Sequence, residues 1–347
     1  MVTLLLKTVG IPMGLSVALV PGAKYLAKKW HILDNPSPPR IHINSTPLLG
    51  GLAVYSAMVI YVASRGAIAG YLMALVAACG VAVLLGALDD RFDIQSRFRL
   101  CVQASLALLL GLAGFRTFHL PYVLDLALST IWITGMINAM NCFDCADGVC
   151  GGVSCVILLC YGGMLTLAGH ASLALISYAS AGAACGFLMF NFPPAKIFMG
   201  DCGSTALGLL IGAISLRATA DSASRYVLYA AAPVALPVAD ILIVHIRRYF
   251  SGIHNIRDLL ASKGRDHLPH RLMDIGLTSR QTALCLYFVT GLLATVPITI
   301  RRSPSIAHTT LTLAVLAVLA VEWQYMKSKL PAEAVVVSME EAPTLNV

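Results

Sequence analysis

Two adjacent carboxylates stand where a long apolar run of the sequence ends. The segment LLGALDDRFDIQSRFRLCVQ, residues 84–103, places Asp89 and Asp90 side by side, with Asp93 one helical turn further on. Adjacent carboxylates repel one another unless a cation or a shared proton compensates them. Magnesium is typically bound by one or two carboxylates together with substrate phosphates. The pair therefore indicates phosphate chemistry, although a solvated helix end balanced by Arg91 and its neighbouring arginines would give the same pattern.

A second polar cluster, NAMNCFDCADGVCGG, occupies residues 138–152. Asn138, Asn141, Asp144 and Asp147 recur every three residues, so on a helix they would drift slowly around one face. Such a face is poorly suited to lipid and is better explained as a polar pocket for a ligand. A capping Asp followed by a glycine-rich bend is the alternative interpretation.

The third segment, NFPPAKIFMGDCGS at residues 191–204, joins two apolar runs. Its two prolines end a helix, and two glycines flank Asp201 in a tight turn that opens the next run. A loop entering a helix N-terminus favours anions, and Lys196 adds a cation suited to phosphate. Phe198 offers a face for stacking a base. A plain N-cap at Asp201 is the alternative.

The fourth segment, SKGRDHLPHRLMDIGLTSRQ at residues 262–281, concentrates positive charge. Lys263, His267, His270 and Arg271 lie within nine positions of one another, in the longest predicted inner loop. Two histidines could indicate zinc, but no further Cys or His lies nearby in sequence to complete a tetrahedral site. Ordinary positive charge at the cytoplasmic side does not account for the histidines. A loop that grips phosphate explains all four residues.

The fifth segment, LDNPSPPRIHINSTPLLGG at residues 33–51, carries Arg40, His42 and Thr46 and is the weakest signal alone. Together the five segments supply paired carboxylates, a third Asp in a turn, amides and a basic loop. Phosphoryl transfer needs metal-neutralised oxygens, donors aimed at developing charge and in-line positioning. The combination predicts an enzyme of that class.

The composition shows what must position these segments. Of the 347 residues 58% are hydrophobic and 12% charged, whereas soluble domains carry about 25% charged residues. The net charge of +7 comes from residues between apolar runs, without a patch of interleaved aromatics, which argues against nucleic acid as a partner. Most of the ten cysteines lie inside apolar runs, and Cys142 and Cys145, spaced C-x-x-C, have no second pair to make a metal site.

The apolar runs predict an all-α, polytopic transmembrane helix bundle of 10–11 spans, because a span needs roughly 20 apolar residues. This integral membrane domain covers residues 1–326, and residues 327–347 form a cytoplasmic tail that we expect to be disordered. The candidate spans are 3–20, 48–64, 70–88, 99–114, 122–139, 149–168, 172–190, 204–218, 226–246, 282–299 and 307–325.

The basic residues orient the bundle. With the N-terminus outside, 17 of the 24 Lys and Arg fall on the inner side and 7 on the outer side, so the positive-inside rule selects this orientation. The same orientation gathers nearly all polar clusters on the cytoplasmic face, which predicts a one-sided active site. An ion-coupled transporter is the rival from another class, but its carboxylates would lie near the bilayer midplane between repeated halves, and no internal repeat is evident.

The five segments also resemble, in order, the motifs of the polyprenyl-phosphate N-acetylhexosamine-1-phosphate transferases, glycosyltransferase family 4. Members of this family initiate enterobacterial common antigen, teichoic acid and lipid I synthesis. LDDRFD resembles the family's D-D-x-x-D, NAMNCFDCADG its N-A-x-N-x-x-D-G-x-D-G, and PAKIFMGDCGS its P-A-K-x-F-M-G-D-x-G-S. RDHLPHRL resembles the H-x-H-H-R-L loop, and RIHINSTPLLGG the R-x-H-x-x-P-T-P-x-x-G-G loop.

The resemblance implies a role for each matching residue. Asp89 and Asp90 would handle the lipid phosphate, one of them as base, and Asp144 completes the catalytic set. Asp201 would bind magnesium with Asn141 nearby, and manganese would substitute. The substrate-binding residues would be Arg99 and Arg271 for the diphosphate, Phe198 and Asp147 for uracil, His267 and His270 beside the sugar and its phosphate, and Lys196 and Thr46.

The resemblance further implies a reaction and a location. A polyprenyl phosphate, by default undecaprenyl phosphate, would attack a UDP-sugar, by default UDP-N-acetylglucosamine, in one step or two, releasing UMP and starting a lipid-linked envelope glycan. The enzyme would lie in the bacterial inner membrane, as a homodimer, with its site facing the cytoplasm. Cys145 and Pro269 replace a glycine and a histidine of the family pattern. UDP-N-acetylmuramoyl-pentapeptide is the alternative donor, and Asp93 together with the loop at His267 argues against it.

Overall fold

The computed structural model describes residues 2–34, 45–68, 70–117, 120–220, 227–252, 266–300 and 302–329. Arg40, His42, Lys263 and the tail from residue 330 onward, on which predictions were made, lie outside these ranges.

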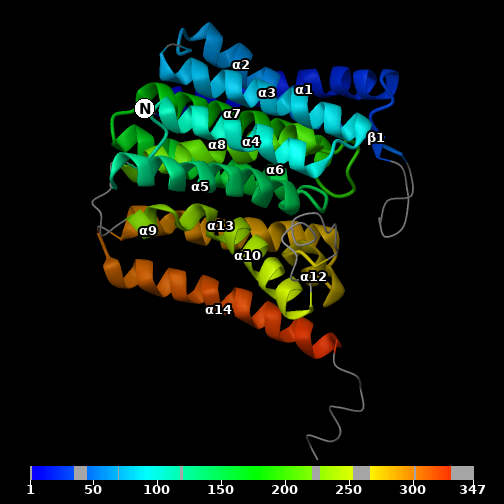
Figure 1. Cartoon of the computed structure of the whole chain (residues 1–347), viewed down its shortest axis with the longest axis vertical. Helices are drawn as coiled ribbons and strands as arrows, with labels where there is room; N and C mark the ends of the chain where they lie inside the picture. Colours follow the sequence, from blue (N-terminus) through cyan, green and yellow to red (C-terminus); the bar gives the residue numbers. More distant parts are fainter. Residues whose placement is uncertain are drawn as a thin grey trace, which may run out of the picture.

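The described chain is an all-α bundle, as predicted (Figure 1). Its strands in these ranges are two residues long, β1 (Leu33–Asp34) and β2 (Thr46–Pro47), paired antiparallel with Asp34 opposite Thr46. The helices are α1 (Val2–Lys29), α2 (Gly50–Ser64), α3 (Tyr71–Phe92), α4 (Ser96–Leu112), α5 (Tyr122–Phe143), α6 (Val149–Leu167), α7 (Ala171–Asn191), α8 (Asp201–Ala220), α9 (Val227–Ala230), η2 (Ala232–Val234), α10 (Ala235–Phe250), α12 (Leu268–Asp274), α13 (Ser279–Thr299) and α14 (Pro304–Lys329).

Every predicted span overlaps a helix, but the helices differ in length. Within the described residues eight are long and apolar enough to cross a membrane: α1, α3, α5, α6, α7, α8, α13 and α14. The apolar helix α2, with 15 residues, is shorter than a full span. The run 226–246 is broken into α9, η2 and α10 near Pro233, because proline cannot donate the helical hydrogen bond. The chain is therefore a multi-pass membrane protein.

The helix α8 forms the centre of the bundle. Nearly all its residues are buried, and it packs against α2, α3, α5 and α6. A Cβ added to Gly86 of α3 would collide with the backbone of Asp201 and Cys202, and one added to Gly51 of α2 would collide with Gly203. These glycines let the backbones approach closely, which is how helices associate in lipid.

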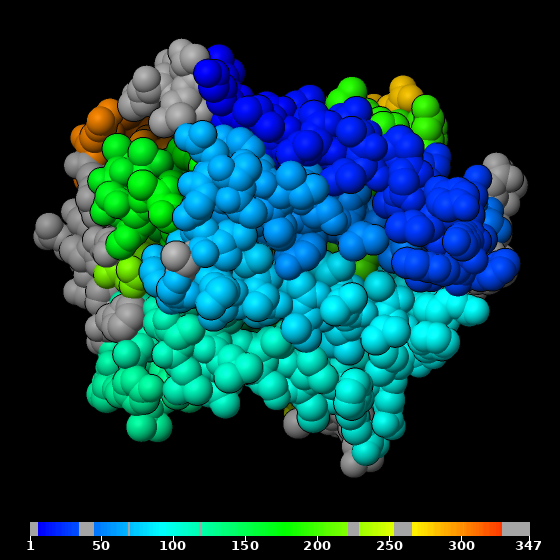
Figure 2. Space-filling model, turned by 90° about the horizontal axis from the view of Figure 1, so that it is seen from above, coloured from blue at the N-terminus to red at the C-terminus, as the bar shows by residue number. Residues whose placement is uncertain are grey.

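The outer helices lie on opposite sides of this centre. In Figure 1, α1 and α2 lie at one edge of the bundle and α14 at the other, while α10 and α13 lie between α14 and the middle layer. Figure 2 shows the face formed by α1 to α5, with α1 in dark blue beside α2 and α3. The ends of α3 and α5 and the starts of α4 and α8 meet at one end of the bundle, beside β1 and α12 (Figure 1). The polar segments are therefore brought together by the antiparallel course of the helices.

Candidate active site

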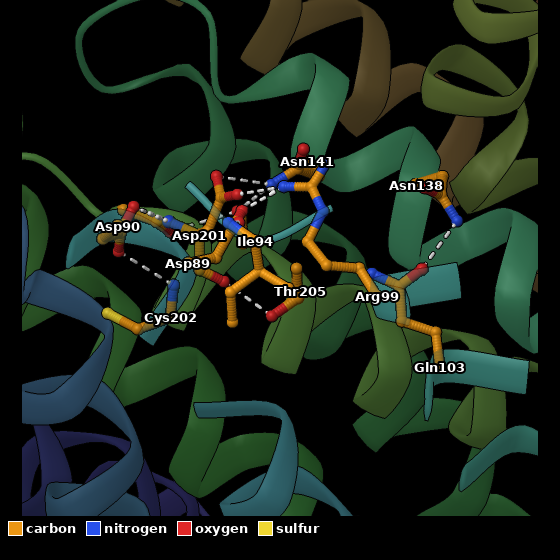
Figure 3. A network of polar contacts seen from close by, with 12 residues as sticks. Asp89, Asp90, Ile94, Arg99, Gln103, Asn138, Asn141, Asp201, Cys202 and Thr205 are labelled. Carbon is orange, nitrogen blue, oxygen red and sulfur yellow. Dashed lines mark hydrogen bonds and ion pairs between the residues drawn. The ribbon is translucent and has the colours of Figure 1, made fainter. Parts of the chain in front are cut away.

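The second carboxylate of the acidic pair is bonded to the backbone at the start of α8. Asp90 Oδ1 accepts a hydrogen bond from the Asp201 N–H at 3.0 Å, and its Oδ2 accepts one from the Cys202 N–H at 3.3 Å (Figure 3). The first N–H groups of a helix have no intrahelical partner, and an anion there also meets the positive end of the helix dipole. Asp90 thus joins the end of α3 to the first turn of α8.

The first carboxylate of the pair serves a different contact. Asp89 accepts the Ile94 N–H at 2.8 Å on Oδ1 and forms an ion pair with Arg99 through Oδ2. The same Arg99 Nη1 donates to Asp201 Oδ2 at 2.9 Å. One guanidinium from α4 therefore bridges carboxylates from α3 and α8, as Figure 3 shows.

The helix α5 contributes an amide to the same cluster. Asn141 Nδ2 donates to Asp201 Oδ1 at 2.9 Å and to Ser204 Oγ at 3.0 Å. Asn138, one turn earlier, bonds instead to Gln103 of α4 at 3.1 Å (Figure 3). Because α5 ends at Phe143, the three-residue spacing places only these two asparagines on one helix.

The remaining acidic residues of the second cluster lie beyond the end of α5. Asp144 follows the last residue of the helix, and burial raises the pKa of its carboxyl well above the usual range, with the charges of Asp201 and Asp90 raising it further. Asp147 Oδ2 accepts the Ala195 N–H at 2.9 Å, so the loop before α6 is tied to the loop before α8. This end of the bundle therefore crowds several carboxyl groups into a small volume.

The predicted base-stacking residue lies against the N-terminal loop. The Phe198 N–H donates to the Pro47 oxygen at 2.8 Å, and the Gly50 N–H donates to the Phe198 oxygen at 3.0 Å. Next to this contact, Lys196 and Thr46 line a hollow of about 250 Å³ that Lys24 and Lys28 also border. The structure thus places the fifth segment (residues 33–51) beside the third (residues 191–204), although they are far apart in the sequence.

The basic loop is held by a carboxylate that the sequence reasoning did not single out. Asp240 of α10 accepts hydrogen bonds from His267 at 2.8 Å and from Arg271 at 2.7 Å. Arg271 is fully buried, and its guanidinium also forms an ion pair with Glu322 of α14. His270 is buried in the same short helix, α12. The Cys142 thiol interacts with the His267 imidazole, which connects the basic loop to the end of α5 beside Asn141.

A signal for both missed carboxylates was present in the sequence. Asp240 interrupts the apolar run 226–246, and Glu322 interrupts the run 307–325. A carboxylate within a membrane segment is expensive unless it is paired, so each implies a cationic partner inside the bundle. Which partner it meets cannot be obtained from spacing, because the partners lie on other helices.

The oxygen atoms around Asp201 suit a hard cation. Among the residues that the structure describes, no group of three His, Cys, Asp or Glu side chains could hold a metal by itself. Asp89, Asp90 and Asp201 bring three carboxylates against one guanidinium, that of Arg99, so their charge is only partly compensated. Magnesium uses few protein carboxylates and completes its shell with water and substrate phosphates. The donor set therefore fits magnesium that arrives with a phosphate ligand.

Comparisons with known proteins agree with the resemblance that the motifs suggested. Residues 71–219 match the profile described as glycosyl transferase family 4. The undecaprenyl-phosphate alpha-N-acetylglucosaminyl 1-phosphate transferase of Escherichia coli K12 is 32% identical over 295 residues, covering 79% of this chain and 78% of that protein. The decaprenyl-phosphate N-acetylglucosaminephosphotransferase of Mycolicibacterium smegmatis is 31% identical over 316 residues, covering 78% and 76%. An enzyme with the same name as the first, from Yersinia pestis, is 30% identical over 297 residues, covering 80% of each chain.

Proposed function

The chain belongs to glycosyl transferase family 4, the polyprenyl-phosphate N-acetylhexosamine-1-phosphate transferases, and from this membership we propose that it transfers N-acetylglucosamine-1-phosphate from UDP-N-acetylglucosamine to undecaprenyl phosphate. The observation that carries the proposal is the convergence on Asp201 of motif side chains from three other helices: Asp90, Arg99 and Asn141. The product is a polyprenyl-diphospho-sugar that starts a lipid-linked envelope glycan, and UMP is released.

The reaction is a displacement at phosphorus. An oxygen of the lipid phosphate attacks the sugar-bearing phosphorus of the donor, a new P–O bond forms, and the bond to the bridging oxygen breaks as UMP leaves. The lipid phosphate is already ionised at neutral pH and needs little help from a base. Both oxygens of Asp89 and both oxygens of Asp90 already accept hydrogen bonds or ion pairs. This arrangement supports direct attack rather than a covalent intermediate on either residue.

The chain's own residues would position the two phosphates. Asp90 holds the start of α8 so that Asp201 faces Arg99, and Arg99 is placed to move from its two carboxylates toward the donor diphosphate. Asp201 and Asn141 would hold magnesium. Magnesium, when bound, would neutralise charge that develops on the diphosphate. Asp144 adds a further buried carboxyl group beside this site.

The surrounding loops would bind the uracil and the sugar of the donor. Phe198 and Asp147 would recognise uracil by stacking and hydrogen bonding, and His267 and His270 would lie by the sugar and its phosphate. Lys196 and Thr46 border the hollow beside Phe198 and would attract the anionic donor. UDP-N-acetylmuramoyl-pentapeptide is not favoured as the donor, because the relatives are named for N-acetylglucosamine. A transporter is likewise not favoured, since the carboxylates of the Asp201 cluster lie at helix ends.

The test of the proposal is reconstitution with defined substrates. Purified protein would receive undecaprenyl phosphate, UDP-N-acetylglucosamine and magnesium, and UMP and lipid-linked product would be measured. An Asp201→Asn variant and an EDTA sample would serve as controls. Magnesium-dependent UMP that requires the lipid and disappears in the variant supports the proposal. Folded protein that releases no UMP from a panel of UDP-sugars contradicts it.

The location follows from the same orientation argument. The protein would lie in the bacterial inner membrane with the Asp201 cluster facing the cytoplasm, because most Lys and Arg belong to loops at that end. A reporter that is active only in the cytoplasm should be active when it is fused after Lys329. The homodimer that the resemblance implies can be checked by native mass spectrometry in detergent.

A further inference from the structure

A carboxylate of α10 organises the start of α12. Asp240 is 2% exposed, and its Oδ2 contacts His267 Nδ1 at 2.8 Å. Its Oδ1 accepts the Leu268 N–H at 2.6 Å and Arg271 Nη2 at 2.7 Å. One buried side chain therefore binds the N-cap histidine ring, the first helical N–H and an arginine in the first turn of α12.

A second carboxylate, on the last described helix, closes on the same arginine. Glu322 of α14 forms ion pairs with Arg271 and, at 3.3 Å, with Arg247 of α10. The Arg271 guanidinium is thus enclosed between carboxylates from α10 and α14 and has no solvent exposure. α14 lies outside the segments that carry the sequence motifs and outside residues 71–219, which match the family profile.

We infer that Asp240 and Glu322 are positioning residues for the donor site, acting through His267 and Arg271. Asp240 contacts Nδ1 of His267 and the Cys142 thiol also interacts with this imidazole, so the ring is held in one orientation beside the end of α5. Glu322 pairs with Nη1 of Arg271, whereas Asp240 pairs with Nη2. In this way α14 helps to position a donor-binding residue. The assignment rests on the proposed function, because only a sugar-nucleotide donor would place a phosphate beside His267.

The groups around His267 make it a cation at neutral pH. Burial lowers the pKa of the imidazole, but the hydrogen bond and charge of Asp240 outweigh burial and raise the pKa to about 10, with a contribution from Cys142. The other charged neighbours are Arg271, on the same carboxylate, and Asp266, which pairs with Arg248 at 2.7 Å. A buried imidazolium aimed at a diphosphate strengthens binding, whereas a neutral ring does not.

The kinetic test uses variants that keep side-chain shape. Asp240→Asn should raise the KM for UDP-N-acetylglucosamine roughly tenfold and move the alkaline limb of kcat/KM down by about 2 to 3 pH units. Asp240→Glu, which keeps the charge, should have its alkaline limb closer to the wild-type pH than Asp240→Asn. Glu322→Gln should raise KM several-fold without moving the limb. Asp274→Asn removes an exposed carboxylate from the same α12 and should change neither quantity.

A second readout does not depend on activity. Of the two forms of histidine, diethyl pyrocarbonate modifies the neutral imidazole and not the imidazolium. His267 should therefore resist it at about pH 7.5 in the wild type and react in Asp240→Asn, as measured by peptide mass spectrometry. Folding of each variant is checked by thermal unfolding in detergent. An unmoved pH limb together with an unreactive His267 in folded Asp240→Asn overturns the inference. If the wild type makes no UMP, the proposed function fails, and the His267 modification still decides whether Asp240 controls the ring.

Discussion

The Asp90 carboxylate accepts a hydrogen bond at 3.0 Å from the backbone N–H of Asp201, 111 positions further along the chain. This contact separates the tasks of two neighbouring acidic residues that look equivalent in the sequence. Asp90 fixes the position of α8, the helix that carries Asp201. Asp89 instead pairs with Arg99, which also pairs with Asp201.

Replacing Asp90 should affect stability and activity together. Asp90→Ala removes both acceptors for the first N–H groups of α8 and should lower the free energy of unfolding by about 1 kcal/mol, with a loss of kcat of roughly 10²-fold. Asp90→Asn keeps one acceptor oxygen and should lose less of both. Thermal unfolding and UMP release measure the two effects. Equal losses in the two variants would mean that the charge, and not the contact with α8, is what matters.

Replacing Arg99 should separate catalysis from metal binding. Arg99→Gln leaves Asp89 and Asp201 without their shared cation, so activity should fall roughly 10²-fold while magnesium binds more tightly. Magnesium titration of the thermal midpoint, together with kcat, measures both directions. Arg99→Lys should be intermediate, because an ammonium cannot reproduce the planar guanidinium fork. Weaker magnesium binding by Arg99→Gln would show that the metal does not share these carboxylates.

The contact between α3 and α8 should leave no room for a methyl group at Gly86. Gly86→Ala would push a Cβ into the backbone of Asp201 and Cys202, and this overpacking should destabilise the protein by roughly 1–3 kcal/mol and reduce activity. Gly14→Ala in α1 is the matched control, because no atom beyond its own stretch of helix lies within 4 Å of its added Cβ. Comparison of the thermal midpoints checks the difference. Equal midpoints would contradict the packing described for α8.

The His267–Asp240 pair should make stability depend on alkaline pH. Because the folded state raises the pKa of His267 to about 10, the pair's contribution is fully present below the ordinary histidine pKa and is lost as the pH rises through about 10. The thermal midpoint of the wild type should therefore fall more than that of Asp240→Asn between neutral pH and about pH 10. Parallel curves for the two proteins would show that the pair does not couple folding to protonation.

Much of the architecture was predictable because lipid imposes simple rules. Apolar runs of span length had to be helices, and the runs around Val149–Leu167 and Ala171–Asn191 were located within a few residues of their ends. The prolines and glycines of residues 191–204 correctly placed the end of α7 and the start of α8. The break of the run 226–246 near Pro233 was not predicted, although proline supplies its reason.

The sequence by itself determined the residue types of the site and the end of the bundle at which they gather, because charge asymmetry and helix periodicity are local properties of the chain. Only the tertiary structure decided which side chains meet. It directed Asp90 to the α8 backbone and Arg99 to two carboxylates, and it turned Asn138 toward Gln103. It also brought Asp240 and Glu322 to Arg271. These pairings join helices far apart in sequence, and they depend on rotation and close packing of whole helices, which no spacing along one segment encodes.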